Sequence, residues 1–505
     1  MKDAPVVSAK VNINELMKLS HVKFGTSGAR GLVSDMTDRI CYIYTCGFLQ
    51  YLQGLGEITK GKTDIAVAGD LRQSTPGIMR AVFQAIIHRG YTPVNCGLLP
   101  SPAIALYGIT NRVPAIMVTG SHIPDDRNGI KFNKSSGEIL KSDEVALKTQ
   151  TVEIDESLFD EMGSLLSERI SDLSPITDSA KKLYYHRYLN YFPKDFLSGK
   201  HIGFYQHSAV GKELLPDILC QLGAHVSCFG ESDTFVPVDT EAIRTEDVKL
   251  AKDQAAKLNC DVVFSTDGDS DRPLISDETG TWLRGDIIGI LCSAYLEADS
   301  VTTPVSCNTA LEKSGLFKNT RRTQIGSPFV VASMIAAKQE NFNRITGYEA
   351  NGGFLTNSTF QKKDKNLAPL PTRDALLPLL CIMGLSIQKK LPISEMVGNL
   401  PQRFTISSRL KDFPVSRSQD IIKSLHTGNM QQDILAVEKI FKPLFGPVTT
   451  LDTTDGVRIV FESEEIVHLR PSGNAPEFRC YNEADTEVRA QEMNNQCIKL
   501  MESWR

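Results

Sequence analysis

Two short stretches carry residue types that could do chemistry. The first, Thr119-Gly-Ser-His-Ile-Pro124, follows an apolar run at 114–118 that is short enough to be a buried strand. Its proline prevents a helix from starting directly after the serine. A serine at the carboxyl end of such a strand faces the crevice in which open α/β sheets hold their ligands. Ser121 is therefore a candidate nucleophile, although a hydroxyl in a simple strand-end turn would give the same pattern.

The second stretch, Asp267-Gly-Asp-Ser-Asp-Arg272, places three carboxylates at alternate positions after another apolar run, 261–264. Alternating acids on an extended loop can turn toward one point, and their hard oxygens suit a magnesium ion that keeps open positions for substrate. A calcium-binding EF-hand loop needs Gly at its sixth position and Glu at its twelfth. Those positions are Arg272 and Glu278, and the arginine makes calcium a poor fit. Arg272 can instead pair with an anion such as phosphate.

Three glycine-rich stretches carry polar groups that could bind anions or hydroxyl groups. Phe24-Gly-Thr-Ser-Gly-Ala-Arg-Gly31 could cradle an anion with backbone N–H groups. Glu349 and Asn351 lie between glycines and could hold neighbouring sugar hydroxyls. Arg470-Pro-Ser-Gly-Asn-Ala-Pro-Glu-Phe-Arg479 combines two arginines, a serine and an asparagine, as a phosphate clamp would. Each of the three, taken alone, could also be a turn with incidental polar residues.

Composition places the chain among globular proteins with several domains. It has 505 residues, 41% apolar and 23% charged, which is too long for one core. The formal charge of −5 (55 basic against 60 acidic residues) argues against nucleic acid as a partner. We find no apolar run of about 20 residues and no signal peptide, so no membrane association is expected. Eleven scattered cysteines without a Cys-x-x-Cys pair indicate reduced thiols and a cytoplasmic location.

Apolar runs alternate with helical patterns through most of the chain, which predicts βαβ units and mostly parallel, mixed sheets. Strands are expected at 64–70, 91–96, 115–119, 200–205, 224–229, 261–264, 304–306 and 322–325, and helices at 77–88, 101–108, 211–222, 286–298 and 329–338. Beyond residue 400 the pattern becomes strand-rich and ends in a helix at 486–504. The expected fold class is α/β, with three repeated α/β domains and a smaller C-terminal α+β domain.

These motifs together, in their order along the chain, resemble those of the α-D-phosphohexomutase superfamily, which contains phosphomannomutases and phosphoglucomutases. The family's serine loop reads Thr-Ala-Ser-His-Asn-Pro, and its metal loop reads Asp-Gly-Asp-x-Asp-Arg. The resemblance extends from about residue 23 to the C-terminus and implies four domains around a central cleft. These are a phosphoserine domain (1–170), a metal-binding domain (171–299), a sugar-recognition domain (300–402) and a phosphate-binding domain (403–505).

The resemblance also implies roles for particular residues. Ser121 would carry a phosphoryl group and complete a Mg²⁺ site formed by the three aspartates. Lys131 is the first candidate for proton transfer and His122 the second, while Arg30 and Arg272 would stabilise the transferring group. The residues expected to bind metal are Ser121, Asp267, Asp269 and Asp271; those expected to bind the sugar are Glu349 and Asn351; and those expected to bind phosphate are Arg470, Ser472, Gly473, Asn474 and Arg479.

This resemblance predicts interconversion of hexose 1-phosphate and hexose 6-phosphate through a hexose 1,6-bisphosphate, which would also serve as activator. Mannose is the expected sugar and glucose is expected to be accepted, with phosphoglucosamine as an alternative. The sugar loop departs from the family pattern Gly-Glu-x-Ser-Gly-His, because Asn351 replaces the serine and Gly353 the histidine. A metal phosphatase that works through phosphoserine and a catalytically inactive sugar-phosphate sensor are the rival classes. The oligomeric state, monomer or dimer, is left open.

Overall fold

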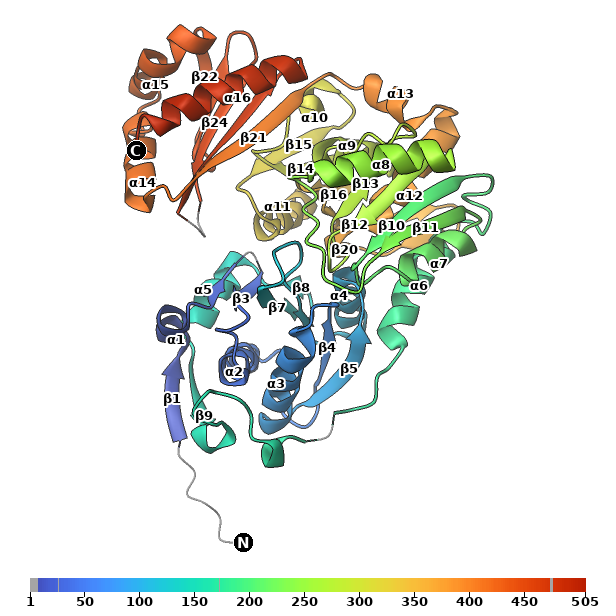
Figure 1. Ribbon diagram of the computed structural model, residues 1–505, viewed down its shortest axis with the longest axis vertical. Helices are drawn as coiled ribbons and strands as arrows, with labels where there is room; N and C mark the ends of the chain where they lie inside the picture. The colour runs from blue at the N-terminus through green and yellow to red at the C-terminus, as the bar shows by residue number, and fades with distance from the viewer. Residues whose placement is uncertain (1–7, 26, 172, 473–475) are drawn as a thin grey trace. The chain divides into compact units, whose positions relative to one another are not determined.

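The computed structural model describes residues 8–25, 27–171, 173–472 and 476–505. The chain divides into two compact units that are each built from separate segments (Figure 1). The first unit comprises the chain up to Ala298 together with Ser327–Ser394. The second comprises Asp299–Gly326 and Glu395–Arg505. The predicted four-domain boundaries stay a prediction.

The first sheet of the first unit is mixed, with strand order β2-β3-β7-β6-β4-β5 and β8 paired to β7. Its strands are β2 (Lys23–Phe24), β3 (Gly28–Leu32), β4 (Asp64–Gly69), β5 (Thr92–Leu98), β6 (Ala115–Val118), β7 (Arg127–Lys134) and β8 (Gly137–Glu138). Parallel pairing is confined to β4 with β5 and β6, because β7 returns beside β6 as an antiparallel neighbour. The parallel share of this sheet is thus smaller than predicted.

Helices and short elements complete this part of the chain. They are β1 (Ser8–Asn12), α1 (Ile13–Ser20), α2 (Asp38–Gly54), α3 (Thr75–His88), α4 (Ser101–Asn111), α5 (Lys141–Lys148), β9 (Thr151–Asp155) and the 3₁₀ turns η1 (Glu156–Leu158) and η2 (Ser167–Arg169). A large hydrophobic core cluster lies where α2 and α3 pack against this sheet (Figure 1). There the rings of Phe48 on α2 and Phe132 on β7 stack with their centroids 4.6 Å apart.

The second sheet has the order β11-β10-β12-β13, with β10 parallel to both β11 and β12. Its elements are α6 (Ser179–Tyr191), β10 (His201–His207), α7 (Leu214–Gln221), β11 (His225–Glu231), α8 (Thr245–Leu258), β12 (Val262–Thr266), β13 (Pro273–Ile275) and α9 (Gly285–Tyr295). Every residue of β12 is buried, as the apolar run that precedes the aspartate loop predicts.

The remaining strands of the first unit follow residue 327. The elements are α11 (Ser327–Gln339), β16 (Ile345–Tyr348), β17 (Phe354–Thr356), β18 (Phe360–Lys362), β19 (Lys365–Leu367), β20 (Leu370–Asp374) and α12 (Leu376–Lys389), and α13 (Ile393–Gly398) spans the boundary of the units. β17 pairs antiparallel with both β16 and β20. The loop between β16 and β17 contains Glu349 and Asn351.

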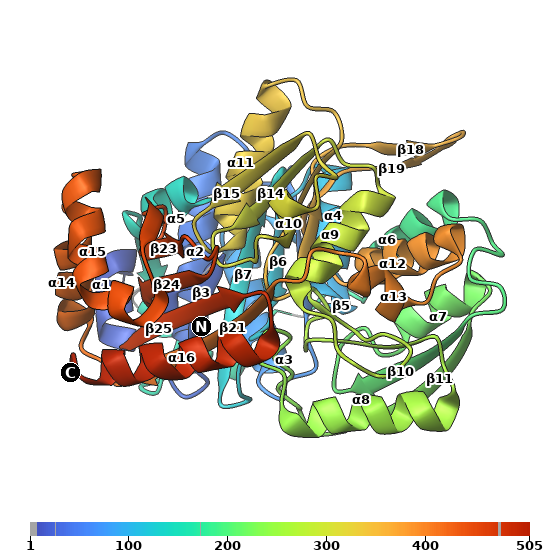
Figure 2. The same ribbon diagram turned by 90° about the horizontal axis from the view of Figure 1, so that it is seen from above.

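The second unit combines a parallel pair with an antiparallel sheet of order β21-β25-β24-β23-β22. Its elements are β14 (Ser300–Pro304), α10 (Ala310–Lys313), β15 (Asn319–Thr323), β21 (Phe404–Lys411), α14 (Val415–Leu425), α15 (Met430–Phe445), β22 (Val448–Asp452), β23 (Val457–Phe461), β24 (Ile466–Pro471), β25 (Glu477–Ala484) and α16 (Glu487–Glu502). α16 packs along β21 and β25 (Figure 2), and Thr486 caps it by accepting a hydrogen bond from Arg489 N.

None of the helices in the described ranges is long and apolar enough to cross a membrane.

Candidate functional site

The serine loop connects β6 to β7 at the carboxyl end of β6, where the sequence pattern predicts it. Ser121 is buried, and its backbone lies in the left-handed region, with φ of 55°. Its backbone N–H donates to Thr119 Oγ1 (2.8 Å), and that hydroxyl donates to Asp70 Oδ2 (2.7 Å). A non-glycine residue in this region is strained, so the surrounding contacts must hold it there.

Arg72 supplies much of that support. Its guanidinium donates to the backbone carbonyls of four residues on or after the serine loop: Ser121, Ile123, Pro124 and Arg127, at distances of 2.6 to 3.1 Å. It also donates to Asp70 Oδ2 (3.2 Å) and lies over the ring of Phe235, 3.8 Å from the centroid. The sequence motif Asp70-Leu-Arg72 suggests only a structural strand cap. The structure shows that this pair fixes the loop that presents Ser121.

Gly120 makes room for Arg72. A Cβ atom at position 120 would lie 2.6 Å from Arg72 Cζ, well inside van der Waals contact. This explains in physical terms why glycine stands where the resembled family motif has alanine.

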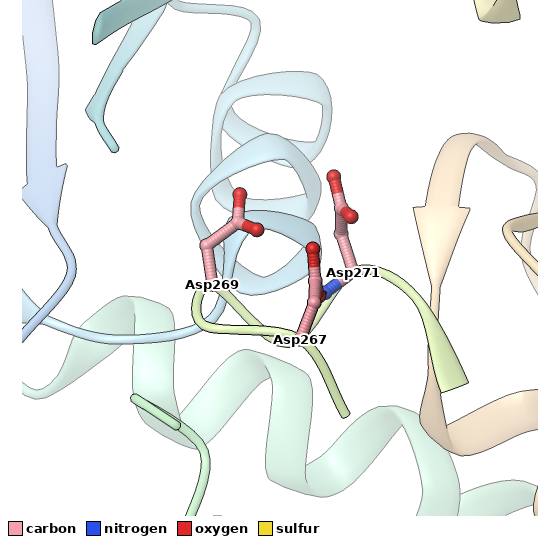
Figure 3. Close-up of side chains that lie close together, drawn as sticks. All are labelled: Asp267, Asp269 and Asp271. Carbon is pink, nitrogen blue, oxygen red and sulfur yellow. The ribbon is translucent and has the colours of Figure 1, made fainter. Parts of the chain in front are cut away.

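The aspartate loop follows β12 and brings its three carboxylates together, as Figure 3 shows. One oxygen from each of Asp267, Asp269 and Asp271 lies within 4.8 Å of the others, and all three side chains are buried. Ser121 Oγ donates a hydrogen bond of 2.6 Å to Asp267 Oδ2. The two loops, 146 residues apart in sequence, therefore form one site.

This carboxylate cluster can hold a metal ion. Asp269 Oδ1 and Asp271 Oδ1 are buried, and neither accepts a hydrogen bond from any described residue. Burial, reinforced by the charges of Asp269 and Asp271, raises the pKa of Asp267 well above its usual value. Buried carboxylates at this spacing are unfavourable without a compensating cation, and oxygen-only donors suit a hard one.

Cationic side chains surround the cluster. Lys131, on β7, donates to Asp269 Oδ2 (2.6 Å) and Asp271 Oδ2 (2.7 Å). Burial alone would lower the pKa of Lys131, but the charges of these two aspartates outweigh it and leave the pKa raised. Burial, together with the neighbouring charge of Arg272, lowers the pKa of Arg30 to about 10. Arg30 therefore stays protonated at neutral pH.

His122 is neutral in this environment. Burial, followed by the charges of Arg272 and Arg30, lowers the pKa of His122 far below its usual value. Arg272 Nη1 lies 2.8 Å from His122 Nδ1, and because a guanidinium can only donate, Nδ1 accepts and the proton resides on Nε2. Ser121 Oγ lies 3.4 Å from the same nitrogen.

Two polar residues of the site lie outside the sequence motifs. Ser101, at the start of α4, donates to Asp269 Oδ2 (2.5 Å). Arg373, on β20, donates to Glu349 Oε2 (2.6 Å) and forms a longer ion pair with Asp271 Oδ2 (3.5 Å). Arg373 thus connects the aspartate loop with the loop that carries Glu349 and Asn351. The Thr-Arg-Asp sequence around Arg373 has no pattern that would single it out.

The proposed phosphate loop belongs to the second unit and is described in part. Arg470 Nε donates to Asp455 Oδ1 (2.8 Å), and Arg479 Nη2 donates to Glu477 Oε2 (3.1 Å). The backbone N–H of Ser472 donates to Glu477 O (2.9 Å). The candidate residues Gly473 and Asn474 lie outside the described residues. The two described arginines thus lie on neighbouring strands, β24 and β25, directly opposite each other.

Comparison with known protein families gives a consistent result. Residues 21–157, 185–280 and 284–404 match the family profiles described as phosphoglucomutase/phosphomannomutase, alpha/beta/alpha domains I, II and III. A phosphomannomutase of Salmonella muenchen is 44% identical over 479 residues, covering 95% of each chain. A phosphomannomutase of Sinorhizobium fredii is 39% identical over 482 residues, covering 95% of this chain and 99% of the relative.

Solved structures share the fold at low sequence identity. A putative phosphomannomutase from Thermus thermophilus superposes with a TM-score of 0.73 at 17% identity, covering 95% of this chain and 99% of that one. An N-acetylphosphoglucosamine mutase from Aspergillus fumigatus, solved with GlcNAc-6P and magnesium, gives a TM-score of 0.55 at 13% identity, covering 98% of this chain and all of that one. The fold, the profiles and the two close relatives agree: the chain belongs to the phosphoglucomutase/phosphomannomutase family, the α-D-phosphohexomutases, and is an enzyme of the isomerase class.

Proposed function

We propose that the enzyme interconverts hexose 1-phosphate and hexose 6-phosphate through a phosphoserine at Ser121, with mannose as the principal sugar and glucose as an accepted one. The observation that supports this most directly is the 2.6 Å hydrogen bond from Ser121 Oγ to Asp267 Oδ2. In this contact a buried serine hydroxyl lies beside a carboxylate cluster that can hold a cation. The identity of 44% and 39% to two phosphomannomutases supports mannose.

In the proposed cycle, the free hydroxyl of the sugar phosphate attacks the phosphorus carried by Ser121. The bond between phosphorus and Ser121 Oγ breaks, a bond to the sugar oxygen forms, and the hydroxyl proton passes to a base of the protein. The resulting hexose 1,6-bisphosphate then returns its other phosphoryl group to Ser121 and recovers the proton. The same bisphosphate, supplied from outside, would load Ser121 and act as activator.

Asp267, Asp269 and Asp271 would hold Mg²⁺, with an oxygen of the Ser121 phosphoryl group completing the site. When bound, Mg²⁺ would offset the nearly two negative charges that such a phosphoryl group carries near pH 7. Arg30 and Arg272 would donate hydrogen bonds to the same oxygens.

We propose Lys131 as the group that exchanges the proton, with His122 as the second candidate. Lys131 must lose its charge to act as a base, and its contacts with Asp269 and Asp271 favour the charged form. Neutralising those two carboxylates is the change that would lower its pKa. Neutral His122 already has the proton on Nε2, so it could act as a donor.

Substrate recognition must tolerate a reversal of the sugar, because either phosphate has to reach Ser121. The hydroxyls on carbons 3 and 4 approximately exchange places in that reversal, and Glu349 and Asn351 would hold this pair. The hydroxyl on carbon 2, where mannose and glucose differ, has no such counterpart, so both sugars should be accepted. The phosphate that is not transferred would bind Arg470, Ser472, Gly473, Asn474 and Arg479. The proposed location is the cytoplasm, where the thiols of the enzyme's eleven cysteines would stay reduced.

A coupled assay with the 1-phosphates of mannose, glucose and glucosamine, with and without a bisphosphate primer, tests the proposal. We expect primer-dependent turnover of mannose and glucose phosphates and poor turnover of glucosamine phosphate. Intact-mass measurement should find one phosphoryl group on the wild-type enzyme, one on a Ser167→Ala control and none on Ser121→Ala. Ser167 begins the 3₁₀ turn η2, outside the site.

Two outcomes would contradict the proposal at different levels. Efficient glucosamine turnover with weak mannose turnover would overturn the choice of sugar and leave the mutase chemistry intact. Release of free phosphate without isomerisation would instead make the enzyme a phosphatase that works through phosphoserine.

A further inference from the structure

Arg373 is a buried cation at the junction of three segments. Its side chain is 3% exposed. Nε donates to Glu349 Oε2 (2.6 Å), Nη2 donates to Ser327 Oγ (3.0 Å), and Nη1 lies 3.5 Å from Asp271 Oδ2. Each edge of the guanidinium thus contacts a different segment: the loop after β16, the start of α11 and the aspartate loop.

The loop after β16 is shaped to admit this side chain. A Cβ atom at Gly353 would lie 2.5 Å from Arg373 Cδ and 2.8 Å from Arg373 Cγ. Any larger residue at position 353 would therefore displace the arginine. The loop is closed on itself by hydrogen bonds from Glu349 N to Gly353 O (3.0 Å) and from Gly353 N to Asn351 Oδ1 (2.9 Å).

The surroundings of Arg373 keep it charged and fixed. Burial would lower its pKa, but Glu349, Asp271 and Glu138 together raise the pKa well above its usual value. Ser327 Oγ, which accepts from Arg373, itself donates to Glu138 Oε2 (2.9 Å). The next residue, Asp374, accepts hydrogen bonds from the hydroxyls of two tyrosines on α6 (Tyr184 and Tyr188), which anchors the end of β20.

Glu349 is held by only one of its two oxygens. Oε2 accepts from Arg373, whereas Oε1 accepts no hydrogen bond within the part of the chain that the structure describes. When a rigid guanidinium donates a hydrogen bond to one oxygen of a carboxylate, it restricts the rotation of the group and fixes the direction of the other oxygen. That oxygen is available to accept a hydrogen bond from a ligand hydroxyl.

We infer that Arg373 is a positioning residue for sugar recognition: it fixes Glu349 so that Oε1 accepts a hydrogen bond from a hydroxyl on carbon 3 or 4 of the hexose. This inference rests on the proposed function. Arg373 itself touches the carboxylate, and the carboxylate touches the sugar. Gly353 is the residue that makes this arrangement possible.

A double-mutant cycle tests this inference: one residue of the protein and one hydroxyl of the substrate are changed, separately and together, and the Kd values are compared. Calorimetric titration would give the Kd of mannose 6-phosphate and of its 3-deoxy and 4-deoxy analogues for the wild-type enzyme and for Arg373→Lys. In the wild type, loss of the hydroxyl that Glu349 holds should weaken binding about 10-fold to 100-fold, as expected for a hydrogen bond to a charged group. Arg373→Lys keeps the charge but cannot contact Glu349 and Ser327 together. In this variant the same analogue should bind less than about 3-fold more weakly than mannose 6-phosphate.

Two further variants separate positioning from stability. Gly353→Ala keeps Arg373 but crowds it, so it should also reduce the penalty for removing the hydroxyl. Arg244→Lys is the control, because Arg244 also holds a carboxylate: its Nε and Nη2 donate to the two oxygens of Asp247 at 2.7 and 2.8 Å. This variant should keep the full loss of affinity on removal of the sugar hydroxyl. Thermal unfolding of each variant shows whether it is folded at the temperature of the titration; if Arg373→Lys is not, Gly353→Ala carries the test.

The outcomes are distinguishable. An unchanged penalty in Arg373→Lys and Gly353→Ala, or no penalty for either analogue in the wild type, would overturn the role of Arg373. Failure of the wild type to bind any hexose phosphate would instead overturn the proposed function.

Discussion

Asp269 and Asp271 each keep one buried oxygen that accepts no hydrogen bond from the described residues, and this makes them sensitive to a small chemical change. Asp269→Asn replaces one charged donor of the cluster by a neutral group of the same shape. We expect weaker Mg²⁺ binding and a turnover at least about tenfold lower, since one charge-assisted contact contributes roughly 1.5–3 kcal/mol. Turnover measured against Mg²⁺ concentration should show partial recovery at high Mg²⁺.

Asp261→Asn is the matched control for this change. Asp261 lies directly before the same strand, β12, and is paired with Lys200 at 2.8 Å, outside the cluster. It should leave the Mg²⁺ dependence unchanged. A wild-type enzyme that keeps full turnover in a chelator would show that the three-acid cluster is not a catalytic metal site.

At the residue scale, the sequence predicts groups that lie in short local patterns and misses those that reach the site from elsewhere. Ser121 and the three aspartates stand at strand ends in recognisable spacings, and the structure brings them together. Arg373 and Ser101 are single residues far from either motif, and only the folded chain places them beside Asp271 and Asp269. The proton-transfer role of Lys131 stays a prediction, because the contacts of this lysine favour its charged form.

At the element scale, the turn between β6 and β7 depends on the space beside Gly120. Gly120→Ala would place a Cβ 2.6 Å from Arg72 Cζ, so either the arginine or the loop must move. We expect a loss of about 1–3 kcal/mol in the free energy of unfolding, as for overpacked cores, together with a large fall in turnover. Urea unfolding and steady-state kinetics measure the two effects.

Gly77→Ala provides the comparison within the same unit. Gly77 lies in α3, and outside its own turn of helix no atom of the described residues lies within 4 Å of an added Cβ. Alanine there should therefore be neutral or slightly stabilising. If Gly120→Ala behaves like Gly77→Ala in both measurements, Arg72 does not hold the serine loop in the way described.

Strand β24 contains a buried histidine whose protonation opposes folding. His468 Nε2 lies 2.6 Å from the carbonyl of Asp455, and a carbonyl can only accept, so the imidazole donates to it. Burial lowers the pKa of His468 to about 4, against an ordinary value of 6.5. Neutral His468 therefore makes its full contribution to the free energy of unfolding above pH 6.5. That contribution is lost as the pH falls from 6.5 toward 4, by up to about 3 kcal/mol.

His468→Gln should remove this pH-dependent contribution. We expect the free energy of unfolding to fall less steeply between pH 6.5 and 4 in the variant than in the wild type, as followed by denaturant titration at several pH values. His207 has a similarly lowered pKa of about 4 and keeps its own contribution in both proteins. Identical slopes would show that His468 is not neutral in the fold.

Elements with a clear pattern are predicted from the sequence, whereas a long helix that is buried on most sides is not. The strands β4, β6, β10 and β12 and the helices α3, α11 and α16 match their predicted ranges within a few residues. α2 was not predicted, because nine consecutive residues, 41–49, are buried and the helical alternation of apolar and polar residues is absent. β14 ends at Pro304, where the sequence suggested a strand would begin.

At the scale of the whole molecule, each of the two compact units combines segments that are not consecutive in the chain. Asp299–Gly326 belongs with the C-terminal segment, and hydrogen bonds explain why. Asn308 Nδ2 donates to Arg403 O (3.2 Å), Thr309 N donates to Glu483 Oε1 (3.0 Å), and Ile325 N donates to Asp455 Oδ2 (3.0 Å). Local sequence patterns carry no information about such distant contacts, so the sequence alone does not predict these two units.

The second unit carries the proposed site for the phosphate that is not transferred, and Arg470 tests its importance for the complete enzyme. Arg470→Ala should raise KM for hexose phosphate and also lower turnover, because binding of the remote phosphate helps to position the reacting end. Arg417→Ala changes an arginine on α14 that donates to the carbonyl of Trp504, and it should leave both constants unchanged. An unchanged KM in Arg470→Ala would remove this loop from the substrate site.

The two glycines that make room for buried arginines also constrain how this sequence could have evolved. With Arg72 in place, a change of Gly120 to alanine creates a steric clash, and the same holds for Gly353 beside Arg373. A larger residue at either position therefore carries a steric cost unless the arginine beside it changes as well. Each glycine and the arginine beside it are therefore linked by their packing. Descendants of this enzyme should change both members of a pair together or keep both.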